Sequence, residues 1–135
     1  MDNQTNYLGL DWGASKVGVA LAHEETRLAL AYGVFKNDEH LVENIGALIE
    51  KEAIKTVVIG VHKKGVFEKE HQSEQLGELL VLRFGIAVEY QDEMFTSKMA
   101  QQNLIAQGQK HVSAHDDAEA AKILLQSFLD KKNGI

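Results

Sequence analysis

Acidic residues stand at three points where apolar segments end or begin. Asp11 ends a strand-like run, Asp92 and Glu93 follow another run, and Asp116 and Asp117 open an apolar helical segment. A carboxylate beside a buried segment is costly unless a hydrogen bond, a cation or a metal ion compensates it. Sites made only of oxygen ligands suit Mg²⁺ or Mn²⁺. We therefore predict that acids from these three points form a site for one of these metal ions.

The phase of the last helix distinguishes its two acids. At 100° per residue, Asp117 lies on the same line as Ala121, Leu124 and Phe128, which is the apolar stripe of the segment. Asp116 lies off this line. The pattern predicts that Asp117 faces the core and that Asp116 does not.

The three points converge if the first and fourth strands are neighbours in one sheet, because ligands bind at the carboxyl ends of such strands. Each acid also has a structural interpretation. Asp11 could accept hydrogen bonds from the glycine turn that follows it. Asp117 could stabilise the N-terminus of its helix. Asp92 and Glu93 could be ordinary loop residues. A shared site explains all three placements at once, and we favour it.

The elements that must position these acids follow from the apolar spacing. Alternating or continuous apolar runs indicate strands, and i, i+3, i+4 spacing indicates helices. The first three strands are joined by short connections, which favours an antiparallel meander. The pattern predicts an α/β fold with an antiparallel half and a parallel half. In the helix expected over 68–84, Leu76, Leu79, Leu80 and Arg83 share one line. The expected order is strands over 7–11, 17–21 and 28–35, a helix over 39–51, a strand over 55–61, a helix over 68–84, a strand over 86–90, and helices over 96–107 and 116–131.

Composition limits the class of protein. The chain has 135 residues, of which 44% are hydrophobic and 25% charged, and we expect one domain over residues 1–135. It contains no cysteine, which excludes disulfides and thiolate metal sites. No apolar run approaches the roughly 20 residues that span a bilayer, and no signal-peptide pattern is present. We expect a cytoplasmic protein that does not bind membranes. The net charge of −6 argues against a large basic surface.

Three lysines are candidates for contact with a nucleic-acid backbone. Lys63 and Lys64 belong to the only locally basic loop, HKKGVFEK, and Lys16 lies in the first turn. The alternative is that they are solvated surface residues.

Glycine and aromatic residues near the first turn are given structural roles. Gly13 is expected to adopt a positive φ, and Gly18 to mark a position where a backbone or a ligand approaches the strand closely. Trp12 and Tyr90 are expected to pack rather than to stack on bases.

Four segments, in chain order and over nearly the whole chain, resemble the motifs of the YqgF family, a group of RNase H-like and Holliday-junction-resolvase-like proteins associated with pre-16S rRNA processing. The resemblance implies an RNase H-like fold with a mixed five-stranded sheet. It also implies that Asp11, Glu93 and Asp117 are the catalytic, metal-binding acids, and so selects Glu93 over Asp92. The segments are GLDWGASKVGVAL, VVIGV, YQDEMFTSKMAQQNL and HDDAEAAKILLQSFLD.

Two departures from the family pattern bear on activity. The arginine that follows Asp-Glu in the family is Met94 here, and the proline after the fourth strand is His62. Methionine cannot replace the bidentate phosphate contact of an arginine.

The expected function is metal-dependent hydrolysis of phosphodiester bonds in structured nucleic acid, with Mg²⁺ or Mn²⁺ as cofactor. The resemblance favours RNA over DNA, as in processing of the 5′ end of pre-16S rRNA. The alternatives are a Holliday-junction-type DNA resolvase and a catalytically weak nucleic-acid-binding module of the same fold. An actin-like ATPase or sugar kinase, which opens with a similar Asp-x-Gly turn, would need two such domains. We expect a monomer or a weak homodimer.

Overall fold

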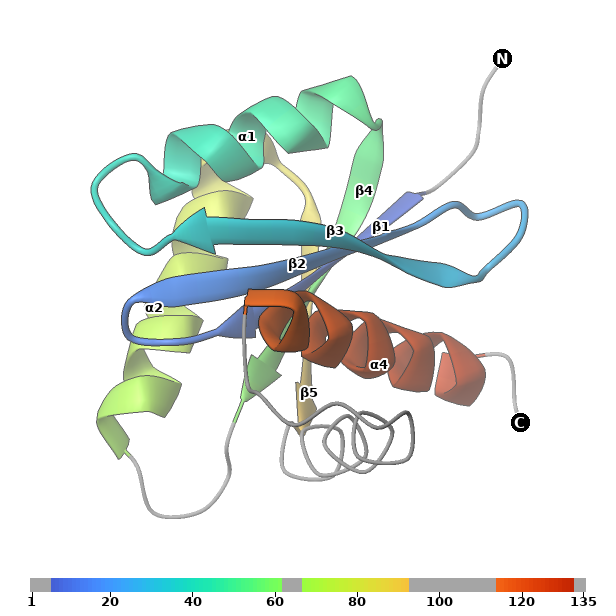
Figure 1. The fold of residues 1–135 in the computed structure, drawn as a ribbon. Helices are drawn as coiled ribbons and strands as arrows, with labels where there is room; N and C mark the ends of the chain where they lie inside the picture. The colour runs from blue at the N-terminus through green and yellow to red at the C-terminus, as the bar shows by residue number, and fades with distance from the viewer. Residues whose placement is uncertain (1–5, 62–66, 93–113, 133–135) are drawn as a thin grey trace.

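A computed structural model describes residues 6–61, 67–92 and 114–132 as strands packed between helices (Figure 1). Among the described residues, no helix is both long and apolar enough to cross a membrane. The predicted helix over 96–107 lies outside this part of the chain. The elements are β1 (Asn6–Trp12), β2 (Lys16–Ala22), β3 (Ala29–Lys36), α1 (Leu41–Lys51), β4 (Ile54–Val61), α2 (Phe67–Phe84), β5 (Ala87–Asp92) and α4 (Ala114–Lys132).

The strands form one five-stranded sheet in the order β3-β2-β1-β4-β5. β1, β2 and β3 pair antiparallel, whereas β4 is parallel to both β1 and β5. The predicted antiparallel meander and parallel half are therefore confirmed. The first and fourth strands are also neighbours in the sheet, as predicted. The carboxyl ends of β1, β4 and β5 consequently lie along the same edge of the sheet.

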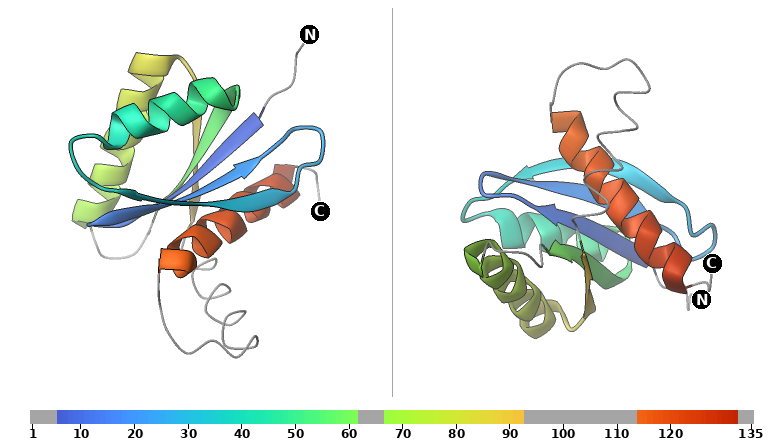
Figure 2. Two further views of the ribbon diagram at one scale, coloured as in Figure 1. Left: turned by 45° about the horizontal axis from the view of Figure 1, so that its top comes forward. Right: turned by 90° about the horizontal axis from the view of Figure 1, so that it is seen from below.

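Helices cover both faces of the sheet, with α1 and α2 on one side and α4 on the other (Figure 2). Side chains alternate along each strand, so β1 contributes to both cores. Leu8 and Leu10 belong to the apolar cluster under α1 and α2. Tyr7, whose side chain points to the opposite face of the strand, belongs to the cluster that contains Ala121 and Leu125 of α4. The face of β1 that carries Tyr7, Gly9 and Asp11 is therefore the face that α4 covers.

The residues on the predicted line of α2 differ in burial. Leu76 and Leu80 are buried, whereas Leu79 is 40% exposed. The helix instead buries Ser73 and approaches the sheet through Gly77, where a Cβ would overlap the Tyr90 hydroxyl. Tyr90 remains 42% exposed, but its hydroxyl end packs against this glycine, as expected for a packing role, and partial burial raises its pKa.

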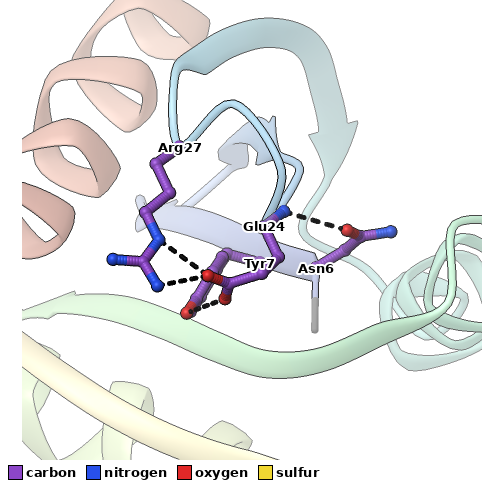
Figure 3. Close-up of polar contacts among 4 residues, drawn as sticks. All are labelled: Asn6, Tyr7, Glu24 and Arg27. Atoms are coloured by element: carbon purple, nitrogen blue, oxygen red, sulfur yellow. Dashed lines mark hydrogen bonds and ion pairs between the residues drawn. The ribbon is translucent and has the colours of Figure 1, made fainter. Parts of the chain in front are cut away.

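Four polar side chains fix the turn between β2 and β3 to the start of β1 (Figure 3). The Tyr7 hydroxyl donates to Glu24 Oε1 over 2.7 Å, and Arg27 Nε donates to Glu24 Oε2 over 2.7 Å. The Glu24 backbone N–H donates to Asn6 Oδ1 over 3.2 Å. Arg27 has a φ of 54°, an uncommon value for a residue with a side chain. The carboxylate of Glu24 therefore holds Arg27, and with it the turn, against Tyr7 of β1.

The same contacts shift two pKa values in opposite directions. Hydrogen bonds from Tyr7 and then from Arg27 lower the pKa of Glu24 below its ordinary value of 4.5. Burial, with the hydrogen bond to Glu24, raises the pKa of Tyr7 to about 12. The Glu24 contribution to stability is thus complete above pH 4.5 and is lost as the pH falls through its lower folded-state pKa.

Replacing Glu24 by glutamine is expected to lower the free energy of unfolding at pH 7 by about 1–2 kcal/mol, because two hydrogen bonds lose their ionised acceptor. The difference from the parent should shrink as the pH falls from 4.5 through the lower folded-state pKa of Glu24, because the parent carboxylate then also becomes neutral. Urea denaturation at pH 7 and at low pH measures both values. Glu25→Gln, a change of the exposed neighbouring residue, should alter neither. An equal loss at the two pH values would show that the charge of Glu24 is unimportant.

Candidate functional site

Asp11 lies near the carboxyl end of β1 and points to the face that α4 covers. In the antiparallel ladder it pairs with Gly18 of β2, so the two residues face the same way. The side chain is half-buried, and its Oδ1 atom is enclosed by protein. The carboxylate therefore lies at the sheet edge with one oxygen inside the fold.

Asp117 reaches the same place from the first turns of α4. Gly18 has no side chain, and a Cβ at this position would overlap the Asp117 carbonyl group. Farther along the helix, a Cβ on Gly9 would lie 2.9 Å from Leu125 Cβ. Two strand positions without side chains thus let α4 rest directly on β1 and β2. The predicted close approach at Gly18 is confirmed, and it brings residue 117 beside the strand position that pairs with Asp11.

The predicted inward phase of α4 agrees with this packing. Ala121 and Leu124 are fully buried, and Phe128 packs against Tyr7 with ring centroids 6.3 Å apart. Asp117 itself is half-buried. The side chain of Asp116 lies outside the described residues, so its predicted outward direction stays a prediction.

The third predicted acid follows the end of β5. The strand ends at Asp92, which pairs with Val61, and so extends two residues beyond the predicted 86–90 run. The extension arises because β4 runs to Val61 and offers a parallel partner that far. Glu93 lies outside the described residues. Two of the three predicted ligand positions are therefore brought together, and the role of Glu93 stays a prediction.

The donor chemistry at this edge fits a hard divalent cation. No group of three His, Asp or Glu side chains able to hold a metal ion occurs within residues 6–61, 67–92 and 114–132. Within the described residues, Asp11 and Asp117 offer carboxylate oxygens, and the Oδ1 atom of Asp11 is buried away from water. Such oxygen donors suit Mg²⁺ or Mn²⁺, which usually keep several waters and need only a few carboxylates.

The loop after Asp11 is held differently from the sequence-based expectation. Gly13 does not have a positive φ, and Gly85 is the glycine with one among the described residues. A Cβ on Gly13 would lie 2.6 Å from the carbonyl oxygen of Lys16, so close approach rather than backbone handedness requires glycine. Asn37 also holds the loop: its Nδ2 donates to the Gly13 carbonyl over 2.7 Å, and its backbone N–H donates to Ser15 over 2.9 Å.

Sequence reasoning missed Asn37, because its only signal was a polar residue at the end of a strand. Trp12 lies on the opposite face from Asp11 and packs, half-buried, against the core under α1 and α2. Its predicted packing role is confirmed.

The predicted basic contacts are described only in part. Lys16 is the first residue of β2 and is exposed, whereas Lys63 and Lys64 lie outside the described residues. Lys16 pairs across the ladder with Lys36, the last residue of β3, which is also exposed. Sequence reasoning did not single out Lys36.

Comparison with known proteins assigns a family to the sequence. Residues 5–131 match RuvX, described as Holliday junction resolvase. A relative from Burkholderia ambifaria (strain MC40-6), named "Putative pre-16S rRNA nuclease", is 33% identical over 131 residues, which cover 92% of this chain and 88% of the relative. A protein of the same name from Burkholderia mallei (strain SAVP1) is 31% identical over 135 residues, covering 96% and 91%.

Comparison of structures confirms the RNase H-like mixed sheet. The Thermus thermophilus RuvC chain in complex with a Holliday junction substrate superposes with a TM-score of 0.62 at 14% identity, covering 96% of this chain and 97% of that one. The fowlpox virus resolvase, in complex with Holliday junction DNA, has a TM-score of 0.63 at 11% identity, covering 95% and 99%. At these identities the similarity concerns the fold.

Proposed function

Since the chain belongs to the RuvX family of Holliday junction resolvases, we propose that it is a nuclease that hydrolyses phosphodiester bonds in structured nucleic acid. The observation that carries the proposal is the approach of α4 to β2 at Gly18, beside Asp11. This approach places residue 117 beside the strand position that pairs with Asp11, and carboxylates are the oxygen ligands that phosphoryl-transfer enzymes use for divalent metals.

In this proposal Asp11, Glu93 and Asp117 are the catalytic residues and hold Mg²⁺ or Mn²⁺. One or two bound ions would supply an activated water and would stabilise the charge on the leaving oxygen. The protein fixes the carboxylates by strand pairing at Asp11 and by helix packing at Asp117. Asn37 holds the loop that follows Asp11 and so limits movement of that carboxylate. Lys16, Lys63 and Lys64 are proposed to contact the nucleic-acid backbone.

RNA is the proposed substrate, in processing of the 5′ end of pre-16S rRNA, and the names of the relatives support it. A DNA resolvase is the second candidate, favoured by the family description and by the junctions bound to the structural neighbours. Met94, in place of the family arginine, favours a third candidate, a nucleic-acid-binding module with weak activity. We further propose a single cytoplasmic nuclease domain over residues 1–135 that is a monomer or a weak homodimer.

Metal-stripped protein tests the proposed chemistry. Incubated with a labelled 16S rRNA precursor fragment, a four-way DNA junction and plain duplexes, it should cut in Mn²⁺ or Mg²⁺ and stop in EDTA, because the ligands are carboxylates. Cleavage of the RNA alone would favour rRNA processing, and cleavage of the junction alone would favour the resolvase. Cutting that continues undiminished in EDTA contradicts the mechanism. Binding without cleavage in either metal would identify the binding module.

A further inference from the structure

Two lysines face each other across the ladder next to the candidate site. Lys16 opens β2 and pairs with Lys36 at the end of β3, and both side chains are exposed. Side chains at opposed antiparallel positions have Cβ atoms about 4.5–5.5 Å apart, and like charges placed there are destabilising. Two lysines thus stand opposite each other in the ladder, and no acid of the described residues forms an ion pair with either of them.

The lysine pair lies on the same face of the sheet as Asp11. Gly18 pairs with Asp11 on one side and with Val34 on the other. Lys16 and Lys36 are each two residues from this row and therefore share its face, about 7 Å farther along the strands. The step leads toward the carboxyl end of β1, at the edge where residue 117 approaches Gly18. A nucleic-acid backbone that passes over Asp11 in this direction would bring its next phosphate groups to the two lysines.

We propose that Lys16 and Lys36 together form a binding site for a backbone phosphate of the nucleic acid, adjacent to the phosphate that is cut. The assignment rests on the proposed nuclease function. An ammonium group binds phosphate as a point charge, and one phosphate placed between two of them removes their mutual repulsion. With a net charge of −6, the protein must attract a polyanion through such local groups.

If the two lysines form such a site, replacing one of them should raise the melting temperature of the free protein and lower its affinity for nucleic acid. Removal of one lysine relieves repulsion in the free protein, so the melting temperature should rise by about 1–2 °C at low salt. The same removal takes one cation from the phosphate, so binding should weaken. If the lysine is only a solvated surface residue, its replacement should change neither the melting temperature nor the affinity. If the lysine supports the fold, its replacement should lower the melting temperature.

Binding in EDTA, where no cleavage occurs, tests the site. The probes are a labelled RNA hairpin with a single-stranded tail and a labelled four-way DNA junction, titrated by fluorescence anisotropy at several NaCl concentrations. For Lys36→Gln, the slope of log affinity against log salt should fall by about one, and affinity at low salt should drop about three- to tenfold. Lys55→Gln, at the other end of β4 from the site, should match the parent.

The outcomes separate this site from the proposed function. An unchanged slope and affinity for Lys36→Gln, or a lower melting temperature with weaker binding, overturns the site even if the parent cleaves nucleic acid. Failure of the parent to bind either probe overturns it as well. A reduced slope for Lys36→Gln but not for Lys55→Gln supports the site, and it does so even if the parent proves unable to cut in Mn²⁺, in which case only the nuclease proposal fails.

Discussion

Replacing Asp11 by asparagine is expected to reduce cleavage at least about 1,000-fold. The change keeps the size of the side chain, so β1 should still pair with β2 through Gly18. It removes one of the negative charges proposed to hold the metal ion. A loss of this size corresponds to about 4 kcal/mol of transition-state stabilisation, within the several kcal/mol that a bound metal ion supplies. Initial rates in Mn²⁺ on the substrate that the parent cuts best provide the measurement.

The melting temperature gives a second readout that needs no substrate. A ligand that binds only the folded state at about 100 times its Kd stabilises it by about 2.7 kcal/mol, which raises the melting temperature of a domain of this size by roughly 10 °C. The parent should show such a rise with Mn²⁺, and Asp11→Asn should lose most of it. Asp130→Asn is a matched control, because it makes the same chemical change far along α4 and retains an acceptor for Gln126. A full Mn²⁺ response in Asp11→Asn would show that Asp11 is not a ligand.

Adding one methyl group at Gly18 is expected to damage both stability and activity. In Gly18→Ala the new Cβ would overlap the Asp117 carbonyl group, so the start of α4 must move away from the sheet. Overpacking of this kind costs about 1–3 kcal/mol, or roughly 4–10 °C in melting temperature. Displacement of a catalytic group by about 1 Å can cost 100-fold in rate. Cleavage measured well below the new melting temperature should therefore fall by about that factor.

Gly33→Ala is the control for Gly18→Ala. Gly33 lies in the neighbouring strand β3, and a Cβ there would have no atom within 4 Å. Its melting temperature and cleavage rate should remain close to those of the parent. If Gly18→Ala were as active as Gly33→Ala, the contact between β2 and residue 117 would not position a catalytic group.

The sequence predicted the features that depend on local periodicity. Alternation along β1 placed Asp11 on one face, and the helical phase placed Asp117 toward the sheet, because both follow from backbone geometry alone. Predictions that depend on neighbouring segments were less successful. The helical spacing put Leu79 on one line with Leu76 and Leu80 but did not reveal that Leu79 is exposed, nor that α2 meets Tyr90 of β5 at Gly77.

Gly13 and Lys36 show the same limit. The need for glycine at position 13 was predicted, but the reason, a carbonyl group three residues later, depends on how the loop closes. The pairing of Lys36 with Lys16 depends on the β2–β3 register, which shifts by a bulge between Val19 and Ala20. The periodicity of the sequence does not reveal such a shift. The contact of Gly13 with the Lys16 carbonyl group and the pairing of Lys36 with Lys16 therefore could not be predicted.

Attachment of α4 to the strands joins distant parts of the chain and therefore influences the order of folding. The Ala29 N–H donates to Gln126 Oε1 over 2.9 Å, between residues 97 positions apart, and Gln126 Nε2 donates to the Arg27 carbonyl over 3.2 Å. Contacts of such long range form slowly, because the entropy of closing the loop is lost before they stabilise anything. A chain in which the helix had not yet docked would carry Asp11 without Asp117 beside it. On the proposed mechanism such a chain would lack part of its metal site, so hydrolysis would begin only once the last helix docks.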